Sequence, residues 1–280
     1  MTDLIAAHDP KLLAEMVVLL LGVGAFAGVL AGLLGVGGGI ILVPAFYYVF
    51  AALGYESVEL MRICVATSLA TIIVTSFRSV LSHHRRGAVD WSVLRGWGPG
   101  IVIGAALGVL VVAQLKTVTL QIIFGSLAFS IGLYMLLGKL GWRFGEQLPT
   151  GFARALVAPV IGTLSVLIGV GGGSFGVPLM TLHGVPVHRA VATSAGFGML
   201  IAVPSVLGFM LVPVAGDLRP PAMLGSVNLL AFAVVIATTL LTAPIGAWLA
   251  HRLDPQVLRR VFAIFLLVMA VNMLRKALLG

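Results

Sequence analysis

Uncharged apolar runs recur along the whole length of the chain, separated by short polar connections. Many of them reach about 20 residues, which is the length a helix needs to cross the roughly 30 Å hydrocarbon core of a bilayer. The pattern predicts an all-α integral membrane protein with five apolar segments in each half. In the first half the segments cover about 12–35, 39–53, 62–82, 91–114 and 118–138, and in the second about 152–169, 173–184, 190–212, 225–250 and 256–276.

Composition agrees with this prediction and narrows the class of protein. The 280 residues are 60% hydrophobic and 9% charged, whereas soluble domains are about 45–50% apolar and about 25% charged. The net charge of +8 comes from 17 Lys and Arg residues that are scattered over the loops, as is typical of membrane proteins with positive cytoplasmic loops. They form no long basic tract, so we expect no nucleic-acid partner.

A glycine-rich sequence, Gly-Val-Gly-Gly-Gly, occurs twice, at Gly35–Gly39 and Gly169–Gly173, and a proline follows each copy five residues later. Three adjacent glycines cover every side of a helix and weaken it, whereas a helix-packing seam needs glycine on one face only. The pattern therefore predicts a pair of broken helices that face a buried site, although packing alone is an alternative. Packing is the interpretation that we favour for Gly100, Gly104 and Gly108.

Further landmarks follow both glycine runs in the same order. Ala66–Ser68 corresponds to Ala192–Ser194, and Gly87–Asp90 corresponds to Gly225–Asn228. This order predicts a duplicated unit, with a first transmembrane repeat at 1–145 and a second at 146–280. Because five is an odd number, the second repeat begins on the opposite side of the membrane, and the two repeats are expected to be inverted.

The positions of the basic residues predict how the chain is oriented in the membrane. The connection between the third and fourth segments is the most basic, so we expect it in the cytoplasm, which places 11 of the 17 Lys and Arg residues there, its own included. Segment 173–184 is too short to cross about 30 Å at 1.5 Å per residue. It is better interpreted as a half-helix or a re-entrant helix, which is tolerated where protein or a hydrated cavity covers it.

The glycine runs are candidates for an anion site. The N-terminus of a helix has unpaired backbone N–H groups and a partial positive charge, and glycine lets a ligand approach that backbone closely. Two such ends that meet from opposite sides would hold a small anion without a buried Lys or Arg, which would be costly in lipid. The predicted anion-binding residues are Gly37, Gly38, Gly39, Gly171, Gly172, Gly173 and Ser174.

Hydroxyl residues extend this candidate site. We assign substrate binding also to Thr67, Ser68, Thr193 and Ser194, and a transport path to Thr71, Thr75 and Arg78. Hydrogen bonds from Thr and Ser to carbonyls of their own helix are the alternative for the hydroxyls, and extension of the side chain to the membrane surface is the alternative for Arg78. Asp90 and Asn228 stand at matching helix starts, where we expect them to cap helices.

The sequence shows no motif for catalysis or metal binding. The two histidine pairs, His83–His84 and His183–His188, have no carboxylate companions in the sequence, and Cys64 is the single cysteine. No nucleophile–base pair is recognisable. We therefore expect no metal, no cofactor and no enzymatic activity.

The paired glycine runs with their following prolines, together with Ala-Thr-Ser after each run, resemble the sulfite exporter TauE/SafE family of membrane permeases. The resemblance covers nearly the whole chain. It implies a multi-pass transporter of a bacterial inner membrane that carries sulfur-containing anions such as sulfite, sulfoacetate or related sulfonates. Ser174 stands where the first half has Ile40, so the two glycine-linked ends are not chemically identical.

Our first hypothesis is a secondary transporter that exports such anions by alternating access. A channel-like anion pore is the second hypothesis, and an intramembrane enzyme or lipid-handling protein is a third and disfavoured one. The expected partners are a small anion and the lipid bilayer, with a homodimer as a candidate assembly.

Overall fold

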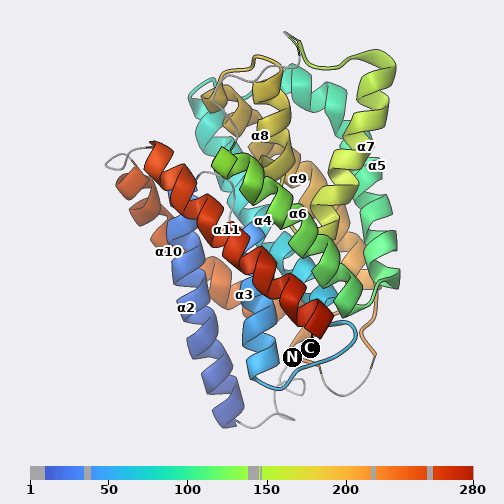
Figure 1. The fold of residues 1–280 in the computed structure, drawn as a ribbon, viewed down its shortest axis with the longest axis vertical. Helices are drawn as coiled ribbons and strands as arrows, with labels where there is room; N and C mark the ends of the chain where they lie inside the picture. The colour runs from blue at the N-terminus through green and yellow to red at the C-terminus, as the bar shows by residue number, and fades with distance from the viewer. Residues whose placement is uncertain are drawn as a thin grey trace.

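The computed structural model describes residues 10–34, 39–137, 145, 147–215, 219–250 and 255–279. Its described part is almost entirely helical (Figure 1). The helices are α2 (Pro10–Leu34), α3 (Gly39–Ala52), α4 (Leu60–Arg85), α5 (Trp91–Gln114), α6 (Thr117–Leu137), α7 (Gly151–Leu167), α8 (Gly173–Leu182), α9 (Val187–Leu211), α10 (Leu229–Ala250) and α11 (Pro255–Leu279).

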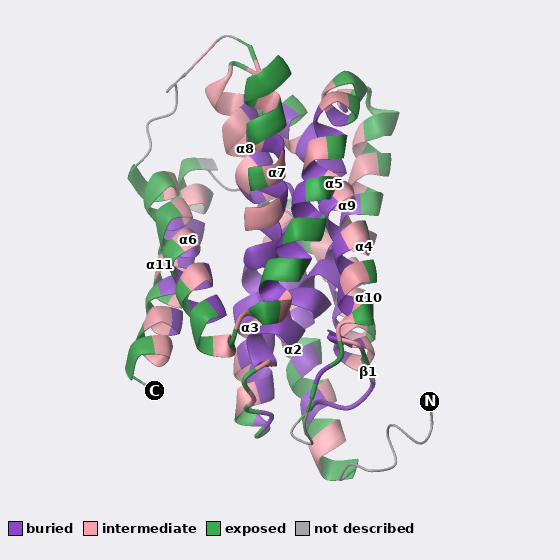
Figure 2. Cartoon of the chain, turned by 90° about the vertical axis from the view of Figure 1, so that its right-hand side faces the viewer, coloured by how far each residue is buried: buried purple, intermediate pink, exposed green. Residues whose placement is uncertain are grey.

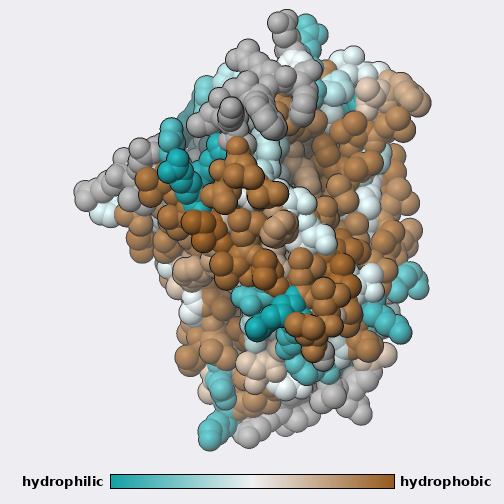
Figure 3. Space-filling view, in the orientation of Figure 1, coloured by the Kyte–Doolittle hydropathy of each residue, from teal (hydrophilic) through white to brown (hydrophobic). Residues whose placement is uncertain are grey.

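Seven of the described helices are long and apolar enough to cross a membrane, whereas α3, α7 and α8 are shorter apolar helices. Large apolar side chains such as Leu110, Leu211 and Leu241 lie exposed on the outside of the molecule. Figure 3 shows that hydrophobic residues cover much of the visible face. An exterior of this kind is expected for a protein whose surroundings are lipid, so the predicted helical membrane architecture is confirmed at this level.

Helices that are far apart in the sequence pack side by side. The main partner of α2 is α10, the main partner of α7 is α5, and α6 packs along α11. Helix α4 lies against α9 in the centre and is the most buried of the seven long helices, with 78% of its most apolar stretch buried. Figure 2 shows the buried residues concentrated in this centre, with α6 and α11 along one flank.

Glycines permit the close approach of α5 and α7, as expected for Gly100, Gly104 and Gly108. A Cβ atom at Gly100 would lie 2.7 Å from the Ala158 side chain, and one at Gly104 would overlap the backbone of Pro159. The Thr163 hydroxyl, from α7, donates a hydrogen bond to the Gly104 carbonyl at 2.9 Å. This seam follows the small-residue packing that is common between membrane helices.

The two short helices α3 and α8 extend toward opposite ends of the molecule. The segment after α3 bonds to the start of α6, where the Thr117 N–H donates to the Val58 carbonyl at 2.7 Å. His183, which follows α8, lies beside Gly145, in the connection after the other end of α6. In Figure 1 α3 accordingly lies in the lower half and α8 in the upper half.

One departure from the predicted helices lies before α10. The sequence suggested a helix from about residue 225, but Met223–Leu224 pairs with Val227–Asn228 in a two-stranded antiparallel hairpin, β1 and β2. Gly225 adopts a φ of +57° in its turn, which glycine accommodates without strain. The described fold is thus all-α apart from these four strand residues.

Basic connections gather at one end of the molecule. Arg189, at the start of α9, forms an ion pair with Asp90 before α5 at 3.4 Å. Arg154 of α7 lies over Gly96 of α5. The connections α4–α5, α6–α7 and α8–α9 therefore share this end, as the orientation deduced from the sequence requires.

Candidate functional site

The second glycine run ends one helix and begins the next. At the end of α7, the Gly169 N–H donates to the Val166 carbonyl at 3.0 Å and the Val170 N–H to the Ser165 carbonyl at 2.9 Å. Gly169 has a φ of +62°, so this is the Schellman motif, which needs a left-handed residue. Gly172 then caps α8. The run therefore brings the carbonyl end of α7 close to the N–H end of α8.

The two glycine runs touch each other. Gly37 and Gly38 lie outside the described residues, but Gly39, the last glycine of the first run, is buried at the start of α3. A Cβ atom there would lie 2.9 Å from the Gly169 carbonyl oxygen and 3.1 Å from the Val170 Cα atom. The short helix α3 thus begins against the turn that precedes α8.

Ser68 of α4 joins both runs. Its buried hydroxyl lies 2.8 Å from the Gly169 carbonyl oxygen and 3.3 Å from that of Gly39. A hydroxyl has one proton to donate, so the shorter contact is the stronger bond and the other carbonyl shares it weakly. We call Ser68, Gly39 and residues 169–174 the glycine junction.

Packing explains part of the glycine content. A Cβ atom at Gly172 would overlap Phe197 of α9, and one at Gly176 would lie 3.1 Å from the Ser194 Cβ atom. Gly171 is less confined, because a Cβ atom there would come no closer than 3.2 Å, to Ile72. Close approach of α8 and α9 is therefore one role of Gly172. The Ser194 hydroxyl bonds within its own helix, to the Val191 carbonyl at 3.1 Å.

Ser174, in the first turn of α8, supplies a hydroxyl to the junction. Ser174 is 8% exposed, and its hydroxyl makes no hydrogen bond to the described residues. Pro178 has no N–H, so the Ser174 carbonyl also lacks its usual partner four residues on. Ser174 therefore keeps hydrogen-bonding capacity next to the N–H groups at the start of α8.

Thr67 and Thr193 make matching hydrogen bonds between the two halves of the chain. The Thr67 hydroxyl accepts the Asn228 N–H at 3.0 Å, and the Thr193 hydroxyl accepts the Asp90 N–H at 3.0 Å. Each threonine thus binds the helix-start residue that belongs to the other half of the chain.

Asp90 and Asn228 are N-caps, as predicted. Asp90 accepts the N–H groups of Ser92 and Val93, and Asn228 accepts that of Ala231 at 2.7 Å. The hydrogen bond from the Ser92 hydroxyl, with help from these N–H groups and the nearby Arg189, holds the pKa of Asp90 below its usual range. Asp90 therefore stays a carboxylate to a lower pH than an unperturbed aspartate would.

The three residues assigned to a path lie along α4 beyond the junction. The Thr71 hydroxyl donates to the Ser68 carbonyl at 2.7 Å, and the Thr75 hydroxyl to the Thr71 carbonyl at 3.2 Å. Arg78 is exposed near the basic end. In this conformation the two threonines bond to their own helix, and their role as a path remains a prediction.

The junction offers hydrogen-bond donors and acceptors but no set of metal ligands. Among the described residues, no group of three or more His, Cys, Asp and Glu side chains is placed to hold a metal ion. Its chemistry is therefore that of backbone groups and hydroxyls.

A comparison with known protein families shows to which family the chain belongs. The family profile described as "Sulfite exporter TauE/SafE" matches residues 20–273, which include both glycine runs and all ten described helices in whole or in part. The chain belongs to this family.

Relatives of this TauE/SafE protein carry transporter names. A probable membrane transporter protein of Haemophilus influenzae is 32% identical over 93% of this chain and 98% of its own length. Another, of Methanocaldococcus jannaschii, is 26% identical over 91% of this chain and 94% of its own. No solved structure matches the chain. With the apolar helices, these names indicate a multi-pass membrane transporter rather than an enzyme.

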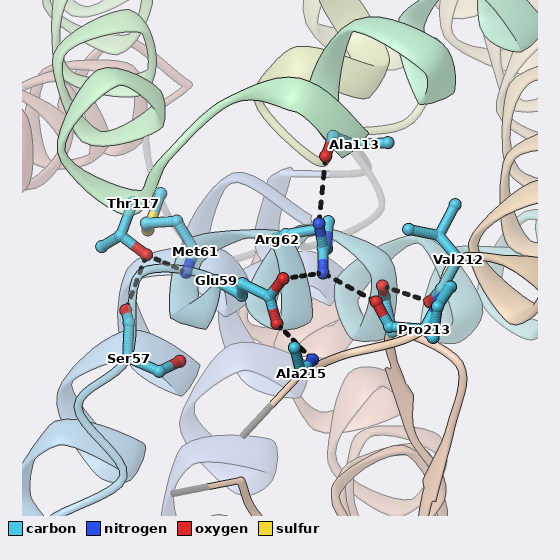
Figure 4. A network of polar contacts seen from close by, with 10 residues as sticks. Ser57, Glu59, Met61, Arg62, Ala113, Thr117, Val212, Pro213 and Ala215 are labelled. Carbon is cyan, nitrogen blue, oxygen red and sulfur yellow. Dashed lines mark hydrogen bonds and ion pairs between the residues drawn. The ribbon is translucent and has the colours of Figure 1, made fainter.

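The structure also contains a buried ion pair to which the sequence pattern gave no role. Arg62 is 5% exposed, and its guanidinium lies 2.7 Å from the Glu59 carboxylate (Figure 4). The available signal was Glu59-Leu-Met-Arg62, an acid and a base three residues apart at the start of an apolar run. The sequence did not reveal that α5 and the segment after α9 cover this pair.

Proposed function

We propose that this TauE/SafE protein is a secondary transporter that exports small sulfur-containing anions, such as sulfite, sulfoacetate or related organosulfonates, by alternating access. One observation carries the proposal: the two glycine runs meet at Ser68 in the buried centre of a membrane protein. The family description supplies the class of anion.

The anion is held by backbone N–H groups at the starts of α3 and α8, including those of Gly39, Gly172 and Gly173, and by the Ser174 hydroxyl. A sulfite or sulfonate group has several acceptor oxygens in a small volume, which converging N–H donors can bind together. The positive ends of two helices replace a buried Lys or Arg.

The helix arrangement supports two inverted repeats, residues 1–145 and 146–280. When the first repeat is superimposed on the second, α2 corresponds to α7 and α5 corresponds to α10. The observed pairs α2–α10 and α7–α5 then become equivalent. The bonds from Asn228 to Thr67 and from Asp90 to Thr193 become equivalent in the same way. A pseudo-two-fold axis through the glycine junction accounts for both facts.

The proposed symmetry supports alternating access. Helices α3 and α8 lead from one junction to opposite ends of the molecule, so exchanging the conformations of the two halves would open the site to each side in turn. We place the protein in a bacterial inner membrane, with the basic end in the cytoplasm.

Transport into proteoliposomes tests the proposal. Sulfite, sulfoacetate, taurine, sulfate and chloride are supplied with and without a pH gradient. We expect saturable uptake of sulfite or a sulfonate, with little flux of chloride. Flux that rises linearly with concentration for all anions would indicate a pore instead, and lipid movement without anion flux would support a lipid-handling protein.

The variant Ser174→Ala locates the site. Because the Ser174 hydroxyl has no protein partner among the described residues, its removal should leave folding unchanged while it raises the KM for sulfite several-fold. Ser130→Ala on α6 is the matched control, since that exposed hydroxyl bonds only to its own helix. Equal KM values for the two variants would contradict a role for Ser174.

A further inference from the structure

Arg62 is a buried charge at the end of the molecule opposite the basic connections. Its two terminal nitrogens donate to the Ala113 carbonyl at 3.0 Å and to the Pro213 carbonyl at 2.9 Å, in addition to the contact with Glu59. Figure 4 shows the guanidinium surrounded by these three partners. Ala113 is in the last turn of α5, and Pro213 follows Val212, the C-cap residue of α9. One side chain thus connects α4 with the ends of two other helices.

The hydrogen-bonding capacity of Arg62 is not fully used. Its Nε atom is buried and has no hydrogen-bond partner among the described residues, and the same holds for the Ser57 hydroxyl in the segment before α4. Buried polar groups are nearly always paired, and an unpaired one calls for an explanation. A guanidinium with a spare buried donor is suited to receive a further acceptor.

The ion pair between Glu59 and Arg62 has no counterpart at the corresponding helix start of the second half. The spacing of 126 residues that relates Ala66 to Ala192 places His188 opposite Arg62 and Val185 opposite Glu59. His188 is exposed and the second half has no comparable buried pair at these positions. The same helix start is therefore built without a buried charge in one half, which indicates a specific role for it in the other.

Arg62 lies on the same helix as Ser68 of the glycine junction. Both Arg62 and Ser68 belong to α4, and six residues of helix correspond to a rise of about 9 Å. Arg62 therefore lies between the junction and the end of the molecule toward which α3 extends.

We propose that the Arg62 guanidinium is a second anion-binding group on the path between the glycine junction and this end, and that the Glu59 carboxylate takes the place of the anion in the conformation seen here. The inference rests on the proposed anion transport and adds a residue to its path. An arriving anion displaces Glu59 from Arg62, and the contacts to Pro213 and Ala113 loosen as that end opens.

Glu59 can be released without becoming an isolated charge. Its second carboxylate oxygen accepts the Ala215 N–H at 2.8 Å. Glu59 also stands immediately before α4, where the positive end of the helix stabilises a carboxylate. It is 19% exposed, against 6% for the Arg62 side chain. The pair therefore separates with the carboxylate toward solvent and the guanidinium toward the anion.

Three variants separate a transport role from a structural one: Arg62→Gln, Glu59→Gln and the double variant. The single Arg62→Gln variant should lose sulfite flux under either role. The double variant removes both charges, so no buried charge is left alone, and its thermal stability in detergent should approach that of the wild type. We expect it to remain without flux, because the anion-binding group is still absent.

The Glu59→Gln variant tests the competition directly. Without the carboxylate, sulfite no longer has to displace an internal competitor, so the KM should fall by about five-fold or more, the lower end of typical coupling between sites. Lys276→Gln is the control, since it breaks the exposed pair with Glu56 at the same end and should leave the KM unchanged.

Two results would overturn the role of Arg62 alone: wild-type flux in a stable double variant, or an unchanged KM in Glu59→Gln. If the double variant does not fold, the KM of Glu59→Gln decides. A wild-type protein that neither binds nor carries any anion of the panel overturns the proposed function as well, because Arg62 then has no anion to receive.

Discussion

At the scale of single residues, hydroxyl groups join parts of this membrane protein that are far apart in the sequence. Ser68 contacts carbonyls of both glycine runs, while Thr67 and Thr193 each accept an N–H group from the other half of the chain. These hydroxyls satisfy backbone groups in buried or partly buried surroundings, where an unpaired group is costly. Their energetic role is thus to pair groups that would be costly to bury alone.

Replacing either threonine by valine tests this role. Thr67→Val leaves the buried N–H of Asn228 without an acceptor, which should lower the free energy of unfolding by about 1–3 kcal/mol. Thr193→Val should have an effect of similar size through Asp90. Unfolding by denaturant in detergent measures both, with Thr181→Val as the control because that hydroxyl bonds only within α8. A negligible loss in both variants would show that water reaches these N–H groups.

The sequence indicated that these residues are structural landmarks, but it did not indicate which groups they contact. Ala-Thr-Ser and the caps Asp90 and Asn228 were recognisable as repeated landmarks, because their spacing is visible in a single chain. The bond from one landmark to another depends on how the halves pack, and no local pattern encodes it. The buried position of Arg62 was not predictable for the same reason, since distant elements bury it.

At the scale of helices, glycine position decides how closely neighbours approach. Gly104 of α5 faces the backbone of Pro159, whereas a Cβ atom at Gly22 of α2 would meet nothing within 4 Å. Both glycines lie within helices, but only Gly22 has space for an added methyl group. They offer a matched pair for measuring the packing contribution.

We expect Gly104→Ala to destabilise the protein by about 1–3 kcal/mol, because the added methyl group forces α5 away from α7. Gly22→Ala should be neutral or slightly stabilising, since alanine favours a helix over glycine. Thermal unfolding in detergent compares the two. Equal effects would mean that the α5–α7 contact adjusts at no cost.

Helix boundaries were largely predictable because long apolar runs end at charged or turn residues, and α5 has the expected bounds, 91–114. The hairpin before α10 was missed, since its strands have only two residues each and lie in an apolar stretch. The Schellman end at Gly169 was also missed, because a glycine that ends one helix cannot be distinguished by composition from one that begins the next.

At the scale of the whole molecule, one end collects the basic connections and the other carries the buried Arg62 pair. The positive-inside rule predicts that the basic end lies in the cytoplasm. Arg86 is exposed at that end, and Val58 is exposed at the opposite one.

Cysteine labelling tests this orientation. In a Cys64→Ser background, a membrane-impermeant thiol reagent applied to intact cells should label Val58→Cys, whereas Arg86→Cys should react only after permeabilisation. The reverse pattern would turn the protein over in the membrane and exchange the proposed directions of uptake and release.

The pairing of α2 with α10 also has a consequence for how the chain is made. A ribosome that has completed α2 at Leu34 must add 194 residues before it begins α10 at Leu229, which takes about 10–40 s at ordinary rates of synthesis. During this interval the newly inserted α2 faces lipid where α10 will later lie. A nascent chain stalled before α10 should therefore be sensitive to membrane proteases and chaperones, and a separately synthesised second half should be able to rescue it.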